Sequence, residues 1–342
     1  MDRIAVAILN WNGLKYLQQF LPSVVENSPD AEVWIIDNGS DDDSLAWVRA
    51  SQPSVLIHEN GKNLGFAQGY NAGLKYIEAD YFVLLNSDVE VTPNWIQPVI
   101  STMKQHAFVA CQPKIMDFNQ KERFEYAGAA GGYMDKDGFA FCAGRIFYQF
   151  EEDLGQYDSS REVFWASGAA LFIEADKWRE IGGLDTDFFA HMEEIDLCWR
   201  LKNRGYSIGY CPDAQVYHVG GGTLHQINPF KTYLNFRNNL YLLTKNHFES
   251  SLASKLLKRL VLDGIAGMRF LTEGNVKYTW SVIKAHFSFY GSLGKMLAKR
   301  KEIKAHLHSP NLKGMYGRSI LVDFFFRGKK RFEQLEKDQF IH

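Results

Sequence analysis

Hydrophobic positions in the first 115 residues alternate between two spacings. Short apolar runs, typical of buried strands, are followed by stretches in which apolar residues recur every three or four positions, as on one face of a helix. The expected strands cover residues 3–9, 32–36, 55–58, 81–85 and 109–115, and the expected helices cover 14–26, 65–77, 95–103 and a segment carrying Leu45, Trp47 and Val48. This order predicts an α/β fold with a mainly parallel sheet and helices on both of its faces.

Polar side chains follow the expected strands at the point where each strand ends. Asn10 and Asn12 follow the first strand, Asp37 ends the second, and Asp88 follows the strand at 81–85. Ligands of open α/β sheets bind beyond the carboxyl ends of the strands, so these residues are candidates for one site. The first turn, LNWNGLKY, has no GxGxxG pattern, which disfavours a dinucleotide-dependent enzyme.

The segments DNGSDDDS and NLGFAQGYNAGLKY are candidates for nucleotide binding. A turn and a helix cap explain residues 41–44, whereas Asp37 could accept a hydrogen bond from a nucleobase. The glycines of the second segment could let a phosphate approach a helix N-terminus. For Gly69 and Gly73 the alternative, a helix packed tightly on the sheet, is equally open.

The segment LLNSDVEV suggests a metal site. It leads from a strand directly into Asn86, Ser87 and Asp88, where a carboxylate could hold a hard divalent cation against a diphosphate. Mg²⁺ or Mn²⁺ takes one or two protein carboxylates and completes its shell with phosphate and water. An Asx turn that closes the strand is the alternative interpretation.

A second acidic group lies in FFAHMEEIDLCWR, where Glu193, Glu194 and Asp196 begin an expected helix. The helix dipole would favour acids there in any case. The preceding aromatic run could also place one carboxylate against an apolar wall, which would raise its pKa and suit a general base. His218, in the later segment QVYHVGG, could complete a metal site with Asp88.

Composition adds constraints on class and location. The chain has 342 residues, of which 46% are hydrophobic, enough for a sizeable core. It has no apolar run of about 18 residues and no recognisable secretory leader. Its four cysteines share no CxxC spacing, which favours reduced thiols in a cytosolic protein. We therefore expect a cytoplasmic location.

Charge divides the chain into two parts. Residues 1–230 hold 17 Lys and Arg against 32 Asp and Glu, whereas residues 231–342 hold 21 against 8. We expect a catalytic domain over 1–230 and a basic, mainly helical region over 231–342. In the basic region, helices are expected over 236–243 and 252–271.

The expected helix at 252–271 has two dissimilar faces. Its apolar face would carry Leu252, Leu256, Leu257, Leu260, Val261 and Ile265, with Lys255, Lys258 and Arg259 opposite. Basic helices with aromatic neighbours can lie on an anionic membrane, here the inner face of the cytoplasmic membrane. Alternatively, they cover the catalytic domain. No motif supports binding of nucleic acid.

Taken together, these segments resemble family 2 glycosyltransferases of the GT-A fold, especially the bacterial rhamnosyltransferase-like and galactofuranosyltransferase-like branch. The matching segments are AILNWNG, IIDNGSDD, NLGFAQGYNAG, LLNSDVEV, ASGAALFI, IGGLDTDFFAHMEEIDLCWRLKNRG and VYHVGGGT. They span roughly residues 4–223 in the order of the family. The family's DxD motif reads NSD here, and its Glu-Asp base motif reads Glu193-Glu194.

The resemblance implies an inverting, metal-dependent transfer of a sugar from a nucleoside diphosphate donor. It assigns nucleobase recognition to Asp37, metal binding to Asp88 and His218, and the general base to Glu194, with Glu193 as the second candidate. The residues expected to bind substrates are Asn10, Asn12, Asp37, Asn38, Asn63, Gly65, Asn71, Asn86, Trp165, Gly168, Ala169 and Arg200. Of these, Trp165–Ala169 would line the acceptor side, and Arg200 would support the helix or the diphosphate.

The resemblance also limits the substrates. The donor would be linked to UDP or dTDP and carry a sugar such as rhamnose or galactose, and the acceptor would be a glycan or a polyprenyl-diphosphate-linked glycan of the cell surface. A processive synthase would need transmembrane helices and a QxxRW motif, which the chain lacks. A noncatalytic sugar-nucleotide sensor or scaffold on the same fold stays open as the alternative function. The oligomeric state is undetermined by the sequence.

Overall fold

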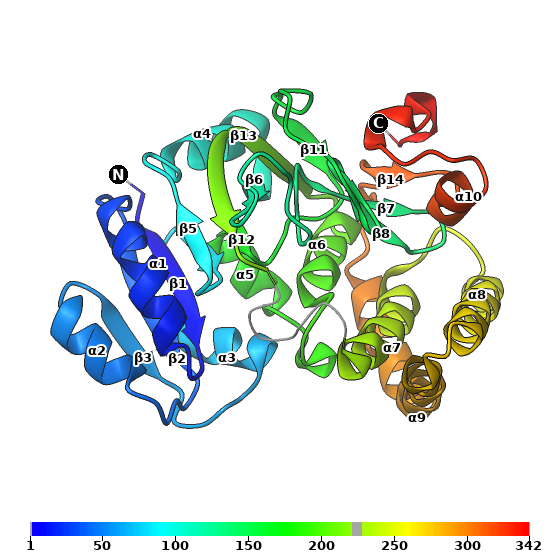
Figure 1. Ribbon diagram of the computed structural model, residues 1–342, viewed down its shortest axis with the longest axis horizontal. Coiled ribbons are helices and arrows are strands. Elements are labelled where there is room, and N and C mark those ends of the chain that lie inside the picture. Colours follow the sequence, from blue (N-terminus) through cyan, green and yellow to red (C-terminus); the bar gives the residue numbers. More distant parts are fainter. Residues whose placement is uncertain (1, 221–227, 342) are drawn as a thin grey trace.

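A central sheet of nine strands organises the structure, a computed structural model that describes residues 2–220 and 228–341 (Figure 1). Its order is β11-β13-β6-β12-β4-β1-β2-β3, with β5 paired to β13. The strands are β1 (Ile4–Asn10), β2 (Glu32–Asp37), β3 (Leu56–Glu59), β4 (Tyr81–Leu85), β5 (Val89–Val91), β6 (Phe108–Asp117), β11 (Arg161–Val163), β12 (Ala170–Glu174) and β13 (Ser207–His218). The last three residues of the motif VYHVGGGT lie outside the described residues.

The sheet is mainly parallel, as the sequence predicts. β3, β2, β1 and β4 run parallel to one another, and β6 is parallel to β13. The exceptions are β12, which is antiparallel to both β4 and β6, and the antiparallel partners of β13. The register of β1 and β2 pairs Asn10 with Asp37, so the carboxyl ends of these strands meet at one edge.

Helices cover both faces of this sheet because successive side chains of each strand point to opposite sides. Val6 and Ile8 of β1 belong to one apolar cluster, whereas Ala5 and Ala7 belong to another. The first cluster is covered by α1 (Leu14–Glu26), α2 (Ser44–Ser51) and α4 (Gln97–His106). The second is covered by α3 (Phe66–Gly73), α5 (Ala175–Ile181) and α6 (Glu193–Asn203). The predicted α/β architecture is confirmed.

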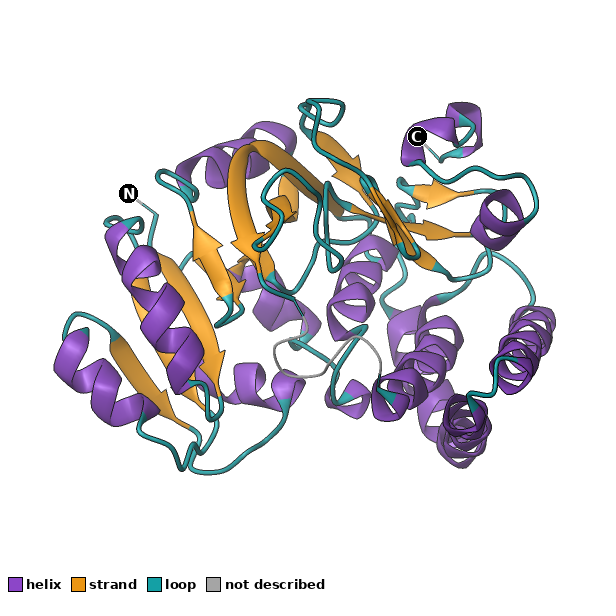
Figure 2. Cartoon of the chain, in the orientation of Figure 1, coloured by secondary structure: helices purple, strands orange, loops and turns teal. Residues whose placement is uncertain are grey.

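A second, smaller sheet was not expected from the sequence (Figure 2). Its order is β10-β9-β8-β7-β14, and its members are β7 (Gly132–Asp135), β8 (Ala140–Cys142), β9 (Arg145–Ile146), β10 (Gln149–Phe150) and β14 (Met315–Tyr316). These strands are too short to produce a clear periodic pattern. Because β14 comes from the C-terminal region and pairs in parallel with β7, the two charge segments of the chain share one sheet.

The C-terminal region is mainly helical and packs on the rest of the chain. It contains α7 (Pro229–Asn246), α8 (Leu252–Thr272), α9 (Val276–Ala305) and α10 (Ile320–Phe325), with the short turns η3 (Phe332–Gln334) and η4 (Lys337–Gln339). Two further short turns, η1 (Leu74–Tyr76) and η2 (Thr186–Phe188), lie earlier in the chain. In Figure 1, α7 lies beside α6, and α8 and α9 lie on the outer side of α7. Within the described residues, no helix is long and apolar enough to cross a membrane.

The predicted faces of α8 are wrong in detail. Arg259, expected on the exposed basic side, is buried, where it pairs with Asp263 and donates to Asn239. This buried network fixes the rotation of α8, so that Leu257 and Val261, expected to be buried, face solvent instead. All four cysteines are buried and unpaired.

Candidate active site

The carboxyl ends of β1 and β2 carry a closely bonded polar loop. Asp37 accepts hydrogen bonds from the Asn10 side chain (3.0 Å), the backbone N–H groups of Gly39 and Ser40, and the Ser40 hydroxyl (2.6 Å). A carboxylate offers about four acceptor positions, and these bonds fill them. Asp37 is also buried, so a direct bond to a nucleobase requires one of the present bonds to open.

Two asparagines brace this loop. Asn12, in the left-handed region with φ 50°, exchanges hydrogen bonds with Asp41. The Asn38 amide donates to Asn63 (3.1 Å) and to the carbonyl of Gly65 (3.0 Å). The loop that follows β2 and the loop that precedes α3 are thereby tied together beside the sheet edge.

Helix α3 sits tightly on the sheet and reaches across to the second half of the chain. A Cβ atom at Gly69 would lie 2.8 Å from Leu9 Cδ1, and one at Gly73 would lie 2.6 Å from Ile36. The packing explanation therefore accounts for both glycines. Asn71 donates to the carbonyl of Leu184 (2.7 Å) and accepts from its N–H (2.9 Å). These two bonds connect α3 to the loop that follows α5.

Asp88 and His218 lie side by side, as the metal-site prediction requires. β13 pairs with β5, and this register sets His218 opposite Val89. Asp88 Oδ1 lies 3.2 Å from His218 Nε2, and the Asn86 amide nitrogen lies 3.3 Å from the same ring nitrogen. Both Asp88 and His218 are buried.

Glu125 is a member of this group that the sequence did not reveal. Its Oε1 lies 3.3 Å from His218 Nδ1, on the side of the ring opposite Asp88. Burial alone would lower the pKa of His218, but the charges of Glu125 and Asp88 raise it to about 10. Burial likewise opposes ionisation of Asp88, yet its contact with His218 keeps the pKa of this carboxyl below the ordinary value.

The donor set at Asp88 fits a divalent cation that shares its coordination with a ligand. One carboxylate and one imidazole are the protein part of such a shell, and phosphate and water would supply the rest. Elsewhere in the described chain, as here, no cluster of three or more His, Cys, Asp or Glu side chains forms a complete metal cage. Glu125 occupies the position of a partner that orients a ligating histidine through its second nitrogen.

The two glutamates at the start of α6 are unusual buried acids. Burial raises the pKa of Glu193 well above its ordinary value, and the nearby charge of Glu194 adds to the effect. Burial also raises the pKa of Glu194, against backbone N–H groups that favour its ionised form. Each carboxyl has one oxygen, Oε2, without a hydrogen-bond partner. Glu193 is almost fully buried, whereas Glu194 is partly exposed.

The loop before α6 is strained. Phe189, His191 and Met192 all have positive φ angles, between 64° and 73°, which non-glycine residues rarely adopt. The buried side-chain amide of Asn238, on α7, donates to the carbonyls of Phe188 (2.9 Å), Ala190 (2.9 Å) and His191 (2.8 Å). Such strain persists only where surrounding contacts enforce it, and it is frequent at active sites.

Charged groups around α6 are largely structural. Arg200 donates to Asp196 (2.7 Å) and to the carbonyls of Ile181 (2.8 Å) and Gly183 (2.7 Å). The buried Lys245 of α7 contacts both Asp196 (2.7 Å) and Asp185. Burial opposes ionisation of Asp185, but Lys245 and Lys299 hold its pKa far below the ordinary value. The structure thus gives Arg200 partners that support the helix.

The loop between β11 and β12 lies between the Asp88–His218 pair and the two glutamates of α6. Trp165 is buried and donates its ring N–H to the carbonyl of Tyr133 (2.9 Å). The carbonyl of Ala169 accepts from the N–H of Asn86 (3.0 Å), while a Cβ atom at Gly168 would lie 3.6 Å from Glu194 Cβ. Gly168 and Ala169 therefore lie between Asn86 and Glu194.

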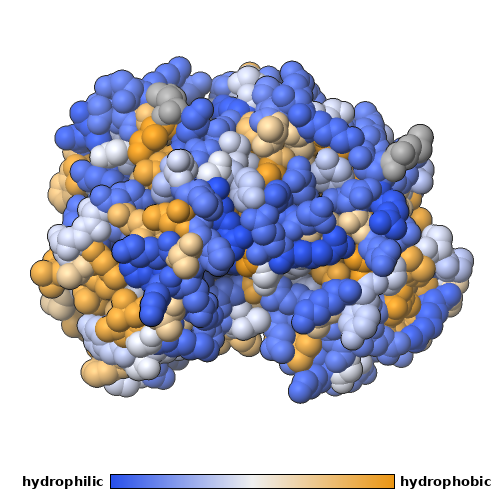
Figure 3. Space-filling view, turned by 180° about the vertical axis from the view of Figure 1, so that it is seen from behind, coloured by the Kyte–Doolittle hydropathy of each residue, from blue (hydrophilic) through white to orange (hydrophobic). Residues whose placement is uncertain are grey.

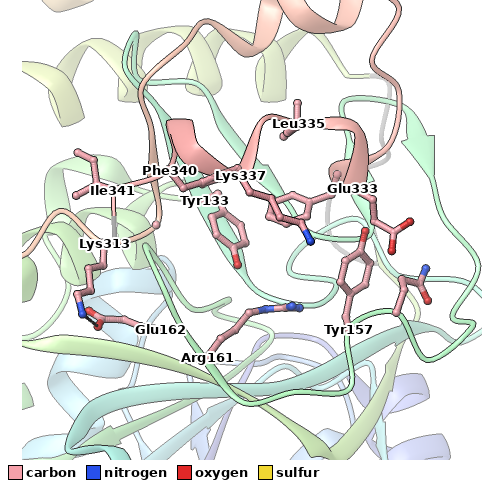
Figure 4. Close-up of a pocket in the computed structure, with 13 residues that line it drawn as sticks. Tyr133, Tyr157, Arg161, Glu162, Lys313, Glu333, Leu335, Lys337, Phe340 and Ile341 are labelled. Carbon is pink, nitrogen blue, oxygen red and sulfur yellow. Dashed lines mark ion pairs between the residues drawn. The ribbon is translucent and has the colours of Figure 1, made fainter.

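A cavity of about 430 Å³ lies apart from these residues (Figure 4). Its walls come from the second sheet, β11 and the C-terminal tail, and include Tyr133, Tyr157, Arg161, Phe332 and Phe340. Tyr133 and Arg161 point into the same space in the close-up view. None of the predicted site residues lines this cavity.

Comparison with known proteins finds a family that the first part of the chain resembles. The family model described as glycosyl transferase family 2 matches residues 5–159. This match covers somewhat less than half of the chain and supports its similarity to glycosyl transferase family 2. The family matches the resemblance found in the sequence motifs, and the matched residues include Asn10, Asp37, Asp88 and Glu125.

The curated proteins that the chain resembles include named glycosyltransferases. The low-salt glycan biosynthesis hexosyltransferase Agl10 of Haloferax volcanii is 21% identical over 81% of this chain and 88% of its own. The N-acetylglucosaminyl-diphospho-decaprenol L-rhamnosyltransferase of Mycobacterium tuberculosis is 25% identical over 64% of this chain and 76% of its own. The mannosyltransferase PcManGT of Pyrobaculum calidifontis, solved with GDP-Man and Mn²⁺, has a TM-score of 0.51 at 12% identity over 90% and 86% of the two chains. This last likeness concerns the fold, and it supports the GT-A assignment.

Proposed function

We propose that this protein is an inverting, metal-dependent glycosyltransferase that moves a sugar from a nucleoside diphosphate donor to a glycan acceptor. One observation carries the proposal: the Asp88–His218 pair and the partly exposed Glu194 lie on either side of Asn86, Gly168 and Ala169. A site for a diphosphate-bound cation is thereby joined to a carboxyl with a raised pKa. The family and its named relatives agree with this class of reaction.

Asp88 and His218 would hold the Mg²⁺ or Mn²⁺ ion, with Asn86 beside them. When bound, the ion supplies positive charge that stabilises the departing diphosphate. The neighbouring Glu125 keeps the imidazole oriented from the other side. Asp37 and Asn38 would hold the loop against which the nucleobase binds, since their side chains are already engaged in building it.

Glu194 is the proposed general base. It takes the proton of an acceptor hydroxyl, whose oxygen attacks the anomeric carbon while the bond from that carbon to the diphosphate oxygen breaks. Attack from the face opposite the leaving group inverts the configuration of the anomeric carbon. The raised pKa of Glu194 makes it a stronger base than an ordinary carboxylate, which suits this proton transfer.

The substrates follow from the relatives. The mycobacterial relative is named for rhamnosyl transfer to a diphospho-decaprenol acceptor, and PcManGT was solved with a nucleoside diphosphate sugar and Mn²⁺. We propose a UDP- or dTDP-linked donor and a polyprenyl-diphosphate-linked acceptor in cell-surface glycan synthesis. Such an acceptor would place the reaction at a cytoplasmic membrane surface.

A thermal-shift screen of nucleoside diphosphate sugars tests the donor site. Donor and Mn²⁺ together should stabilise the folded protein and so raise its melting temperature. At a donor concentration one hundred times Kd, the gain in the free energy of unfolding is about 2.7 kcal/mol. EDTA and the substitution Asp88→Ala should each abolish the shift, while Asp30→Ala, which changes an exposed acid before the other end of β2, serves as the control. An assay for transfer of the sugar from the donor to an acceptor then distinguishes an enzyme from a noncatalytic sensor. A sensor would bind the donor and leave it intact.

A further inference from the structure

The outer face of α8 is apolar and exposed. Leu257, Val261, Ile265 and Met268 recur at the spacing of one helical stripe, and Leu271 continues it. Their side chains are between 45% and 66% exposed. Isolated exposed apolar residues are ordinary on a protein surface, but a continuous stripe of this kind marks an interaction site.

Helix α9 presents a second stripe of the same kind. Val276, Trp280, Ile283, Phe287 and Tyr290 follow the helical repeat and are between 38% and 71% exposed. Figure 3, which views the molecule from behind, shows hydrophobic residues gathered at the side where α8 and α9 lie, with strongly hydrophilic residues among them. We call the exposed residues of these two stripes the α8–α9 face.

The opposite faces of both helices are anchored in the protein. On α8, Arg259 donates to Asp263 and to Asn239 of α7. On α9, Ser292 and Ser288 meet the hydroxyls of Tyr241 (2.8 Å) and Tyr233 (3.0 Å) of α7. The rotation of each helix is therefore fixed by buried contacts, and the apolar stripes are held outward.

Positive charge surrounds the α8–α9 face. Residues 252–301 hold ten Lys and Arg against two acids, Asp263 and Glu273. Both acids are paired within the protein, with Arg259 and Arg269, and acids outside these two helices pair with Lys255, Lys258, Lys295 and Lys299. Lys277 and Lys284 flank Trp280 at helical spacing, and neither forms an ion pair with a described residue. The face thus offers apolar side chains with uncompensated cations beside them.

The end of α8 adds aromatic side chains to this surface. Arg269 lies 5.7 Å from the ring of Phe325 in α10, and the neighbouring Phe326 is 85% exposed. Lys330 lies 5.9 Å from the centre of the ring of Phe325, which is exposed. Aromatic side chains interleaved with Arg and Lys are typical of surfaces that meet the headgroup region of a membrane.

We propose that the α8–α9 face binds the surface of an anionic lipid bilayer, with its apolar stripe among the acyl chains and its lysines among the headgroups. Charge decides the occupant: a second copy of the chain would oppose one cationic face to another, whereas anionic lipid complements both the apolar and the basic groups. The role of this lipid binding rests on the proposed function: it would bring a lipid-linked acceptor to the enzyme. The lipid-binding surface itself stands on the exposed residues.

The face is one helix away from the catalytic loop. Lys295 and Lys299 of α9 contact Asp187 and Asp185, which lie in and before η2. Asn238, on the intervening α7, holds the strained loop that leads to Glu193. A bilayer bound at the α8–α9 face therefore lies beside the helix that supports the site.

Flotation of the full chain with lipid vesicles tests the proposal. The protein should float with vesicles that contain phosphatidylglycerol and remain below with pure phosphatidylcholine. The double variant Lys277→Gln/Lys284→Gln should weaken partitioning by about 30-fold, since each lysine near an anionic surface contributes about fivefold. The double variant Trp280→Ser/Phe287→Ser should weaken it by more than about tenfold. Raising the salt from about 0.1 M to about 1 M should release most of the wild type.

Matched controls make the outcome decisive. Leu154→Ser and Tyr76→Ser remove exposed apolar side chains outside the α8–α9 face and should leave flotation unchanged. All variants alter exposed side chains, so their melting temperatures should equal that of the wild type. The proposal fails if the wild type does not float with anionic vesicles, or if the controls lose as much partitioning as the face variants. It also fails if light scattering without lipid shows a dimer that the Trp280 variant dissociates.

The lipid result and the proposed function can fail separately. The face variants should keep metal-dependent donor binding, because they touch no residue of the candidate site. Flotation without donor binding would retain the membrane surface and remove the transferase. Donor binding without flotation would retain the transferase and remove the membrane surface.

Discussion

Glu125 and His218 form a pair in which a carboxylate oxygen lies 3.3 Å from the ring nitrogen Nδ1. The other ring nitrogen, Nε2, lies 3.2 Å from Asp88. The Glu125 charge favours a proton on Nδ1, although the two atoms do not have hydrogen-bond geometry here, and this leaves Nε2 as the nitrogen available to a cation. Glu125 is therefore a positioning residue, which acts on the metal through the imidazole.

We expect Glu125→Gln to weaken Mn²⁺ binding by about 10- to 100-fold, in the range seen when such partners of ligating histidines are lost. The measurement is a Mn²⁺ titration in the presence of nucleoside diphosphate, followed by calorimetry. Glu122→Gln, an exposed neighbour, is the control. An unchanged Mn²⁺ affinity in Glu125→Gln would remove Glu125 from the metal site.

Glu194→Gln should retain donor binding and lose transfer by about 10²- to 10⁴-fold, the range of a positioned general base. Glu193→Gln, which changes the adjacent and more deeply buried acid, should retain transfer. In the wild type the rate should fall as the pH falls through the pKa of Glu194, which is raised, because the protonated carboxyl accepts no further proton. If Glu194→Gln kept near-normal turnover and Glu193→Gln were inactive, Glu193 rather than Glu194 would be the general base.

Glu193→Gln should also stabilise the protein at alkaline pH. The folded state raises the pKa of Glu193, so it retains a proton that the unfolded chain releases above the ordinary value of 4.5. Unfolding then releases a proton, and the stability of the wild type falls as the pH rises above that value. Urea denaturation at about pH 5 and about pH 8 should show a gain for the variant that is larger at the higher pH. An equal effect at both pH values would mean that Glu193 is ionised in the folded state.

Asn238→Ala should disturb catalysis more than binding of the donor nucleotide. The substitution removes the donor that holds three carbonyl oxygens of the loop before Glu193, and strain in that loop is then free to relax. We expect a loss of about 1–3 kcal/mol of stability and a reduced kcat. Asn239→Ala is a matched control, because its amide donates to Gly138 rather than to the loop. Equal kcat values in the two variants, at temperatures where both are folded, would contradict a specific role for Asn238.

The sequence predicted the elements whose pattern is regular and long. The helix at 14–26 and the strand at 81–85 agree with α1 and β4, because each has a clear apolar period and a definite turn at its end. The second sheet escaped prediction because its strands have two to four residues. The rotation of α8, which buries Arg259 and exposes Leu257 and Val261, depends on the bonds of Arg259, which no periodic pattern encodes.

The candidate site shows the same division. The position of Asp88 after a strand and of His218 at the end of another could be predicted, and their contact follows from strand pairing. Glu125 and Asn238 could not be predicted, because each meets its partner only after distant segments have packed together. The positive φ angles before Glu193 would have marked this loop, but they are properties of the folded backbone.

The amide of Asn238 has a consequence for how the protein is made. The loop that it holds lies about fifty positions earlier in the chain, and α7, which carries Asn238, ends at Asn246. While the chain grows from the ribosome, Glu193 and Glu194 are therefore synthesised well before Asn238, whose side chain holds the loop that precedes them. The growing chain thus passes through a stage in which all strands of the central sheet have been made but the loop before Glu193 has no support. At that stage the apolar cluster under α6 also lacks the side chains of α7 that complete it.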